Sequence, residues 1–336
     1  MHPQPQPAYF DEARGAWVLS RYRDVTEALR EPRLWPLAAG GEDQAVTRDG
    51  TGRLRLRGPV QEALSSAHVA AWQASIEPLA YSLLDGLPRD RPVDLLAGFA
   101  LPWCLEFALL VLGAAPSDRG RLSALGAQVF AATGAPDGSP LRPSAAAATA
   151  ELERLLAGGQ MPMGEPTFVA LSQTTPRLLA SVWTALYSHP AEAERLRASP
   201  ELWPGAVEEL LRYAGIVRGI WRQARGSVEI GAAKMSDGQR AMLMLASANR
   251  DSEQWVEPDR LDVTRRVTSQ LALGAGRHSC IGAGLVRMAV TVATQALFVR
   301  FPTARPCSEP QWRTGSGYCF PASLPVLLCA NARTGS

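Results

Sequence analysis

The stretch Leu271–Arg287, LALGAGRHSCIGAGLVR, decides how the rest of the chain is interpreted. An apolar, strand-like lead-in is followed by a glycine-rich turn, one cysteine and the start of a helix. Gly274, Gly276 and Gly282 have no Cβ, so we expect the backbone there to adopt positive φ and to approach a flat partner closely. The dipole and free amides of the following helix lower the pKa of a thiol, so Cys280 is expected to favour the thiolate.

Three other interpretations of this loop are open. Cys280 could be a small buried hydrophobe, the usual role of a free cysteine. His278 and Cys280 could form half of a zinc site, although the chain has no CxxC motif and no second His/Cys pair at zinc-finger spacing. The glycines do not follow the G-x-G-x-x-G pattern of a dinucleotide-binding loop with its downstream acidic residue.

Residues 273–282, LGAGRHSCIG, resemble the haem-binding loop of the cytochromes P450, whose pattern is Phe-Gly-x-Gly-x-His/Arg-x-Cys-x-Gly. Only the leading Phe differs, since Leu273 stands there. The resemblance implies that Cys280 is the axial thiolate ligand of haem b, and such a ligand favours O–O cleavage at the iron. It also places Gly274, Gly282 and His278 in the haem-binding loop. His278 would either bind a haem propionate or serve only the structure of the loop.

The composition describes a globular protein and excludes several partner classes. The 336 residues are 46% hydrophobic and 20% charged with a net charge of +2, which permits a large core and gives no footprint for nucleic acid. The N-terminus MHPQPQPAYF lacks the features of a signal peptide, and no stretch of membrane-spanning length is free of charge and proline. Five irregularly spaced cysteines suit reduced thiols. We therefore expect a cytoplasmic protein without a membrane segment, with residues 1–8 as a disordered tail.

Hydrophobic periodicity predicts a mainly helical chain with a few short strands. Helical segments are expected over 21–29, 53–68, 76–87, 92–114, 117–132, 144–157, 166–188, 192–211 and 285–299, and strands over 17–20, 219–224, 228–230 and 241–246.

The resemblance to the cytochromes P450 extends over most of the chain. The opening strand and helix WVLSRYRDVTEALREPRL, the E-x-x-R of Glu209–Arg212, the sequence ANRD over 248–251 and a final hairpin near 319–326 follow the order of that family. The resemblance implies a single domain over 1–336 with the mainly α P450 fold and small β-sheets. It also implies a compact variant, shortened in the region before the central distal helix.

Three arginines are candidate ligands of the haem propionates. Arg53 and Arg57 lie at i and i+4 and so point the same way from a helix, where the family carries a His/Arg pair. Arg222 matches the family's strand arginine. A guanidinium fork suits a carboxylate. A solvated basic face is the other interpretation of the first two, since Arg55 lies nearby.

The central helix, expected over 166–188, departs from the family pattern Ala/Gly-Gly-x-Asp/Glu-Thr-Thr/Ser. Here residues 170–175 read ALSQTT, so that Thr174 keeps the threonine while Gln173 replaces the acid and Leu171 replaces the glycine. Glutamine orients water but cannot deliver a proton by cycling its charge, and leucine adds bulk where dioxygen would bind. Pro176 predicts a kink, because it removes one amide from the helix. A packed core helix is the other interpretation.

The resemblance implies that the residues before Arg222 face substrate. Ile216, Val217, Arg218 and Gly219 would lie above the haem together with Leu171. Arg218 would contact an anionic or carbonyl-bearing substrate, or would simply be exposed.

A structural cluster is expected behind the haem loop. Glu209 and Arg212 lie at i and i+3 on a helix and can pair. Arg260, in the sequence EPDRL, resembles the family's third member of a buried Glu-Arg-Arg cluster.

The resemblance implies an oxidoreductase of the monooxygenase type, acting on a small organic molecule in bacterial natural-product biosynthesis. A separate ferredoxin and ferredoxin reductase would supply electrons. Gln173 and Leu171 motivate an alternative, in which the haem serves oxidative coupling, peroxide-driven oxidation, or a non-redox rearrangement or cyclisation. A non-enzymatic relative acting as a partner protein is the third hypothesis.

Overall fold

The computed structural model describes residues 4–37, 58, 62, 64, 66–133, 135, 139–159, 164–315 and 317–328. The chain divides into two compact units. The first unit comprises residues 1–55, 204–281 and 314–319, and the second comprises 56–203, 282–313 and 320–336. Most of the helix expected over 53–68 lies outside the described residues.

The first unit is built on a five-stranded sheet in the order β1-β2-β8-β5-β3. Strand β2 pairs with β8 in parallel, and the other neighbours are antiparallel. The strands are β1 (Tyr9–Asp11), β2 (Ala16–Leu19), β3 (Leu34–Pro36), β5 (Ile220–Ala224) and β8 (Arg240–Leu243), beside a hairpin of β6 (Val228–Ile230) and β7 (Ala233–Met235). The helices are α1 (Tyr22–Arg30), α10 (Trp203–Ala214), whose first residue belongs to the second unit, α11 (Leu245–Ala248) and the 3₁₀ turn η5 (Gly276–His278).

The core of the first unit forms where helix α1 meets the sheet. Val25 and Leu29, at helical spacing i and i+4, are buried in one cluster with Leu19 of β2 and Leu243 of β8. Each such side chain contributes about 1.5–3 kcal/mol when removed from water. Leu271, at the start of the cysteine loop, is also buried in this cluster. The strand-like character expected there was wrong: Leu271 lies in a turn, and its apolar side chain serves as an anchor.

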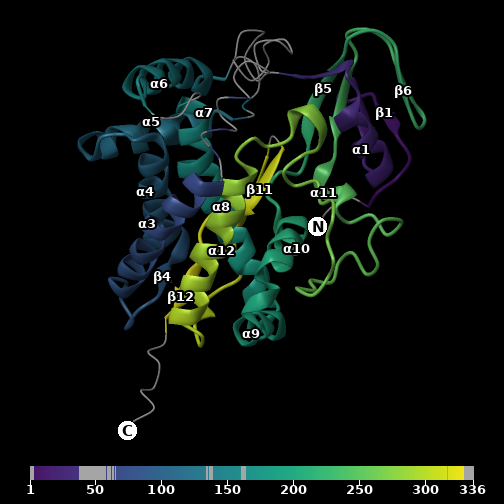
Figure 1. Cartoon of the computed structure of the whole chain (residues 1–336). Helices are drawn as coiled ribbons and strands as arrows, with labels where there is room; N and C mark the ends of the chain where they lie inside the picture. Colours follow the sequence, from purple (N-terminus) through teal and green to yellow (C-terminus); the bar gives the residue numbers. More distant parts are fainter. Residues whose placement is uncertain are drawn as a thin grey trace. The chain divides into compact units, whose positions relative to one another are not determined.

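The second unit is mainly helical. Helix α12 packs against α3 and α8, and α5 packs against α6 (Figure 1). Its elements are α3 (Ser66–Asp85), η1 (Leu96–Ala100), α4 (Leu101–Leu112), η2 (Pro116–Asp118), α5 (Arg119–Ala131), α6 (Leu141–Leu155), α7 (Gly164–Val169), η3 (Ala170–Thr174), α8 (Thr175–Ser188), α9 (Pro190–Ala198), η4 (Pro200–Leu202) and α12 (Ala283–Arg300), with a sheet β4-β12-β9 of β4 (Val93–Asp94), β12 (Pro325–Leu327) and β9 (Arg305–Pro306). Strands β10 (Trp312–Gly315) and β11 (Tyr318–Pro321) form a separate two-stranded sheet.

Two tryptophans organise the core of the second unit. Trp183 of α8 stacks on Phe99 with ring centroids 5.6 Å apart and donates a hydrogen bond to Thr294 of α12 at 3.1 Å. Trp103 of α4 donates its indole N–H to the carbonyl of Ile76 in α3 at 3.0 Å. Both indoles are fully buried, and each satisfies its polar edge inside the core. Among the described residues α12 alone is long and apolar enough to cross a membrane, but over half of it is buried in this core.

The regular α-helix is interrupted just before Pro176, where the sequence predicts a kink. The interruption takes the form of a π-helical turn, η3, whose carbonyl at Ala170 accepts the amide of Thr175. The hydroxyl of Thr175 donates to the same carbonyl at 2.9 Å. Such π-turns often mark functional positions in helices.

Candidate functional site

The cysteine loop is fixed by its own backbone. The amide of Cys280 donates to the carbonyl of Leu273 at 2.8 Å, which closes the loop. Gly274 and Gly276 both have φ of +69°, as the sequence predicts for turns that favour glycine. An added Cβ at Gly276 would lie 2.6 Å from the carbonyl oxygen of Leu29, so only glycine lets the loop pack against α1.

Gly282 differs from this expectation. Its φ is −85°, so the predicted positive φ was wrong there; Gly282 instead caps the first turn of α12. An added Cβ at Gly282 would meet nothing within 4 Å among the described residues. The backbone beside Cys280 therefore leaves room for a close approach, although it needs no special dihedral angle.

The environments of Cys104 and Cys280 separate a structural cysteine from a candidate ligand. Cys104 is fully buried in α4, and burial raises the pKa of its thiol well above the ordinary value. Cys280 is exposed and lies just before the first turn of α12. The role of buried hydrophobe, left open for Cys280 by the sequence, therefore belongs to Cys104.

Tyr318 lies near Cys280, and no motif pointed to it. Burial, and then the charge of Cys280, raises the pKa of the Tyr318 phenol. Tyr318 forms a β-bridge with Val217, and the amide of Cys319 donates to the carbonyl of Ile216 at 2.8 Å. Tyr318 thus comes from a hairpin about forty residues after the cysteine, a distance at which sequence spacing carries no signal.

Of the candidate propionate ligands, the structure describes Arg222 and His278. Arg222 is 5% exposed on β5, and its Nη1 donates to the carbonyl of Trp221 at 2.9 Å. His278 is half-buried at the end of η5. Arg53 and Arg57 lie outside the described residues, so their role stays a prediction.

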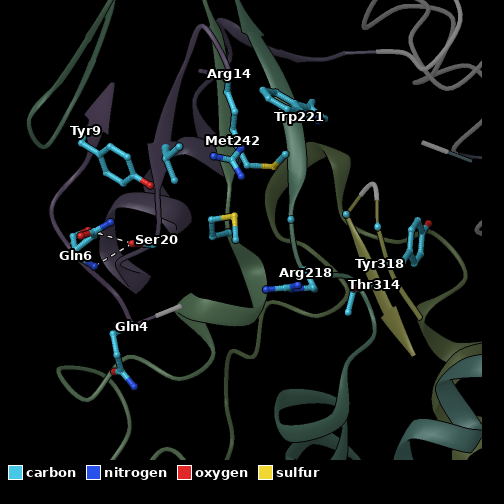
Figure 2. A pocket seen from close by; sticks show the side chains of 15 residues that line it. Gln4, Gln6, Tyr9, Arg14, Ser20, Arg218, Trp221, Met242, Thr314 and Tyr318 are labelled. Atoms are coloured by element: carbon cyan, nitrogen blue, oxygen red, sulfur yellow. Dashed lines mark hydrogen bonds between the residues drawn. The ribbon is translucent and has the colours of Figure 1, made fainter. Parts of the chain in front are cut away.

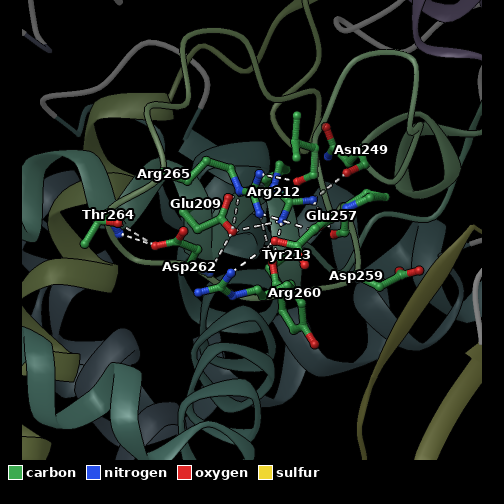
Figure 3. Close-up of polar contacts among 12 residues, drawn as sticks. Glu209, Arg212, Tyr213, Asn249, Glu257, Asp259, Arg260, Asp262, Thr264 and Arg265 are labelled. Atoms are coloured by element: carbon green, nitrogen blue, oxygen red, sulfur yellow. Dashed lines mark hydrogen bonds and ion pairs between the residues drawn. The ribbon is translucent and has the colours of Figure 1, made fainter.

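The Glu-Arg-Arg cluster exists, but its third member is not the predicted one (Figure 3). Arg212 donates to both carboxylate oxygens of Glu209, at 2.7 and 2.9 Å, and both side chains are fully buried. The second arginine on Glu209 is Arg265, whose Nε lies 3.1 Å from Oε1. Arg260 was the wrong choice: its exposed side chain pairs with Glu257, and only its carbonyl contacts the cluster.

This cluster supports the cysteine loop through Asn249. Arg212 Nη1 donates to the carbonyl of Asn249 at 2.8 Å. The side-chain oxygen of Asn249 accepts the amide of Leu271 at 2.8 Å. Since Leu271 begins the loop, a buried ion pair is connected to the loop by two successive hydrogen bonds, which agrees with the structural role predicted for Glu209 and Arg212.

In the second unit, the side chain of Gln173 is buried and held on two sides. Its Nε2 lies 3.5 Å from the hydroxyl of Ser172, and its Oε1 lies 3.4 Å from Nη1 of Arg177. A Cβ added to Gly126 of α5 would lie 3.5 Å from Nε2, so the amide packs toward α5. Leu171 is also buried, at 3% exposure.

Thr174 differs from its neighbour Thr175. The hydroxyl of Thr175 is used inside the helix. Thr174 is half-buried, and its hydroxyl makes no hydrogen bond with the residues that the structure describes. Of the two threonines, Thr174 therefore keeps a hydroxyl available to bind water or ligand.

Arg177 lies in the central helix, and no sequence motif indicated it. Its guanidinium lies 4.1 Å from the ring centroid of Phe130 and 5.5 Å from that of Phe320, and its Nη1 donates to the carbonyl of Gln173 at 2.5 Å. Burial, and then the neighbouring Arg313, lowers the pKa of Arg177 to about 10. A helical arginine is usually a surface residue, whereas this one is covered by two phenylalanines from distant segments.

A cavity of about 500 Å³ in the first unit is lined by two of the predicted substrate residues, Arg218 and Gly219 (Figure 2). Val217 does not line it: its backbone bridges to Tyr318, and its side chain packs against the core. Leu171 belongs to the second unit.

Comparison with known proteins assigns the family. The family model for Cytochrome P450 matches residues 194–314. Cytochrome P450-SU2 of Streptomyces griseolus is 30% identical over 355 residues, which cover 94% of this chain and 88% of that protein. The chain belongs to the cytochrome P450 family.

Solved structures agree with this P450 assignment. The P450 hydroxylase LnmA of the leinamycin pathway of Streptomyces atroolivaceus has a TM-score of 0.81 at 29% identity, covering 93% of this chain and 90% of LnmA. The P450 PksS of the Bacillus subtilis bacillaene polyketide synthase has a TM-score of 0.85 at 25% identity, covering 96% and 94%. The predicted mainly α fold with small sheets is thus confirmed as the P450 fold, while the shortening before the central helix stays a prediction.

P450s carry haem ligated by a cysteine thiolate, and the Cys280 loop fits that group. The thiol is exposed, its backbone is fixed by the bond to Leu273, and the adjacent Gly282 leaves open space. The protein is accordingly an oxidoreductase of the P450 type.

Proposed function

We propose that this P450 is a cytoplasmic monooxygenase that oxidises a small organic molecule in bacterial natural-product biosynthesis. A separate ferredoxin and its reductase supply the electrons. The exposed, backbone-fixed Cys280 is the observation that carries the proposal. Relatives at 29–30% identity are named 20-oxo-5-O-mycaminosyltylactone 23-monooxygenase, from Streptomyces fradiae, and mycinamicin VIII C21 methyl hydroxylase, from Micromonospora griseorubida.

The whole chain, 1–336, serves as one haem-thiolate domain in this proposal. Cys280 holds the iron, and Gly274 and Gly282 keep the backbone close to the ring. Arg222 and His278, together with Arg53 and Arg57, hold the propionates, because guanidinium and imidazolium groups form charge-assisted hydrogen bonds with carboxylates. Haem with a thiolate ligand supplies dioxygen activation and O–O cleavage when bound.

The distal helix provides an altered proton relay. Thr174 holds a water through its available hydroxyl. Gln173 orients this water but does not donate a proton, since an amide does not titrate. Leu171 restricts the space beside them. Protons then arrive from solvent or from the substrate itself.

A second candidate function keeps the haem and omits oxygen insertion: oxidative coupling, peroxide-driven oxidation or a non-redox rearrangement. The observation that favours it is the engagement of Gln173 with Ser172 and Arg177, which leaves no carboxyl group at the relay position.

Two measurements test these proposals. The reduced protein with CO should give a thiolate-type Soret band, and its absence would remove both haem functions. Turnover with ferredoxin, reductase, NADPH and labelled dioxygen should place the label in the product of a monooxygenase. Product without label would favour the second candidate.

A further inference from the structure

The cavity beside β5 and β8 has the size and composition of a ligand site. Its volume of about 500 Å³ falls within the range of small-molecule pockets. All of its lining residues belong to the first unit. One wall comes from the sheet face that carries Val18, Trp221 and Met242. The other walls come from the N-terminal segment, from the loop before β5 and from Thr314, Gly315, Gly317 and Tyr318 (Figure 2).

The N-terminal wall is held by hydrogen bonds. The amide of Gln6 donates to the hydroxyl of Ser20 at 2.9 Å, and that hydroxyl donates back to the carbonyl of Gln6 at 3.1 Å. Gln4 and Gln6, which belong to the tail predicted to be disordered, therefore line the cavity, and Gln6 is fixed by its bonds to Ser20.

Two arginines line the cavity, and they differ in their partners. Arg14 forms an ion pair with Asp11. The guanidinium of Arg218 is half-buried and has neither an ion pair nor a hydrogen bond with the residues that the structure describes. A positive charge in such a place favours an anionic ligand, because burial without a counter-ion is costly.

The rest of the cavity is largely apolar and adaptable. Met242 and Met244 present thioethers, which conform to irregular ligands, and Trp221 and Tyr318 add aromatic surface. Both methionine sulfurs lie close to Gly219, within 3.0 and 3.3 Å of where its Cβ would be. A side chain at position 219 would therefore crowd both methionines.

One residue of the cavity wall interacts with the cysteine. Tyr318 lines the cavity and also lies close enough to Cys280 for the two groups to interact electrostatically. A ligand in the cavity would therefore be anchored in the same unit as the iron ligand.

We infer that this cavity binds a small amphipathic organic acid, with its carboxylate on Arg218 and its apolar body on Met242, Met244 and Trp221. The inference rests on the proposed function and deepens it: it names the substrate class as carboxylates, which the guanidinium fork recognises in a bidentate manner.

Calorimetric titration of the haem-loaded protein tests the inference. The probes are 4-phenylbutyrate, decanoate and indole-3-butyrate, each paired with its neutral amide, and acetate as a bare anion. At least one acid should bind about 10-fold or more tightly than its amide and than acetate, since a hydrogen bond to a charged group contributes about 1.5–3 kcal/mol. Equal binding of every acid and its amide would overturn the inference.

Matched variants locate the effect. R218Q should weaken binding of the preferred acid about 10- to 100-fold and leave binding of its amide unchanged, and R218K should retain part of the preference. R14Q, the same change in the same cavity, should have little effect because Arg14 already pairs with Asp11. An unchanged acid preference in R218Q would refute the assignment.

The CO-difference spectrum of the same preparation reports on the proposed function separately. A thiolate-type band without any acid preference keeps the haem assignment and removes the carboxylate site. An acid preference without that band keeps the carboxylate site and removes the haem assignment.

Discussion

At the scale of single residues, the function depends on Cys280. We predict that Cys280→Ser abolishes the thiolate-type Soret band of the reduced CO complex, because a hydroxyl does not replace a thiolate on iron. Cys307→Ser, the same change at another exposed cysteine, should keep the band. Spectra of the two variants, with equal haem content measured beside them, make the comparison. A retained band in Cys280→Ser would show that another residue ligates the iron.

Gln173 gives a second prediction at this scale. Gln173→Glu places a carboxyl group about where Oε1 now lies, 3.4 Å from Nη1 of Arg177, so the buried charge has a partner. We expect NADPH consumption to rise at least several-fold, since a positioned acid or base contributes about 10²- to 10⁴-fold in proton transfer. Gln173→Leu, which cannot titrate, is the control. If the two variants consume NADPH at the same rate, proton supply at this position does not limit the reaction.

At the scale of elements, the contacts of Glu209 predict which of two arginines stabilises the fold. Arg265→Ala should lower the free energy of unfolding by about 2–3 kcal/mol, because it removes one partner of a fully buried carboxylate. Arg260→Ala should cost less than about 1 kcal/mol, because its side chain forms only an exposed pair with Glu257. Urea denaturation of the two variants provides the test, and equal losses would contradict the assignment.

The same cluster shows how far sequence patterns reach at the scale of elements. Glu209 and Arg212 could be predicted because they are one turn apart on a helix, and the loop glycines because a turn constrains them locally. Arg265 could not be distinguished from Arg260 by pattern, since which side chain turns inward depends on the path of the loop around α10. Arg177 and Tyr318 gave no signal, because residues far away in the sequence create their surroundings: Phe130 and Phe320 for one, Cys280 for the other.

At the scale of the whole molecule, the order of local motifs was sufficient to predict the fold, since β2, α1, the central helix and α12 all lie where periodicity places them. Long-range burial was not predictable in this way. Glu165, in the first turn of α7, is an instance: burial, and then the charge of Glu153, raises the pKa of its carboxyl to about 7. No local sequence pattern marks this residue.

The raised pKa of Glu165 predicts how the stability of the folded chain depends on pH. The folded state holds the proton up to about pH 7, whereas the unfolded chain releases it near the ordinary value of 4.5. Between these values the folded state binds more protons, so stability falls as pH rises and the loss is complete above pH 7. Glu165→Gln should therefore be more stable than the natural protein at pH 8, by about 1–2 kcal/mol after allowing for solvent screening of this half-buried group, and equally stable near pH 4.5. Urea denaturation across this range measures the difference, with Glu12→Gln as an exposed control. A constant difference between Glu165→Gln and the natural protein at all pH values would show that the carboxyl group does not titrate in this window.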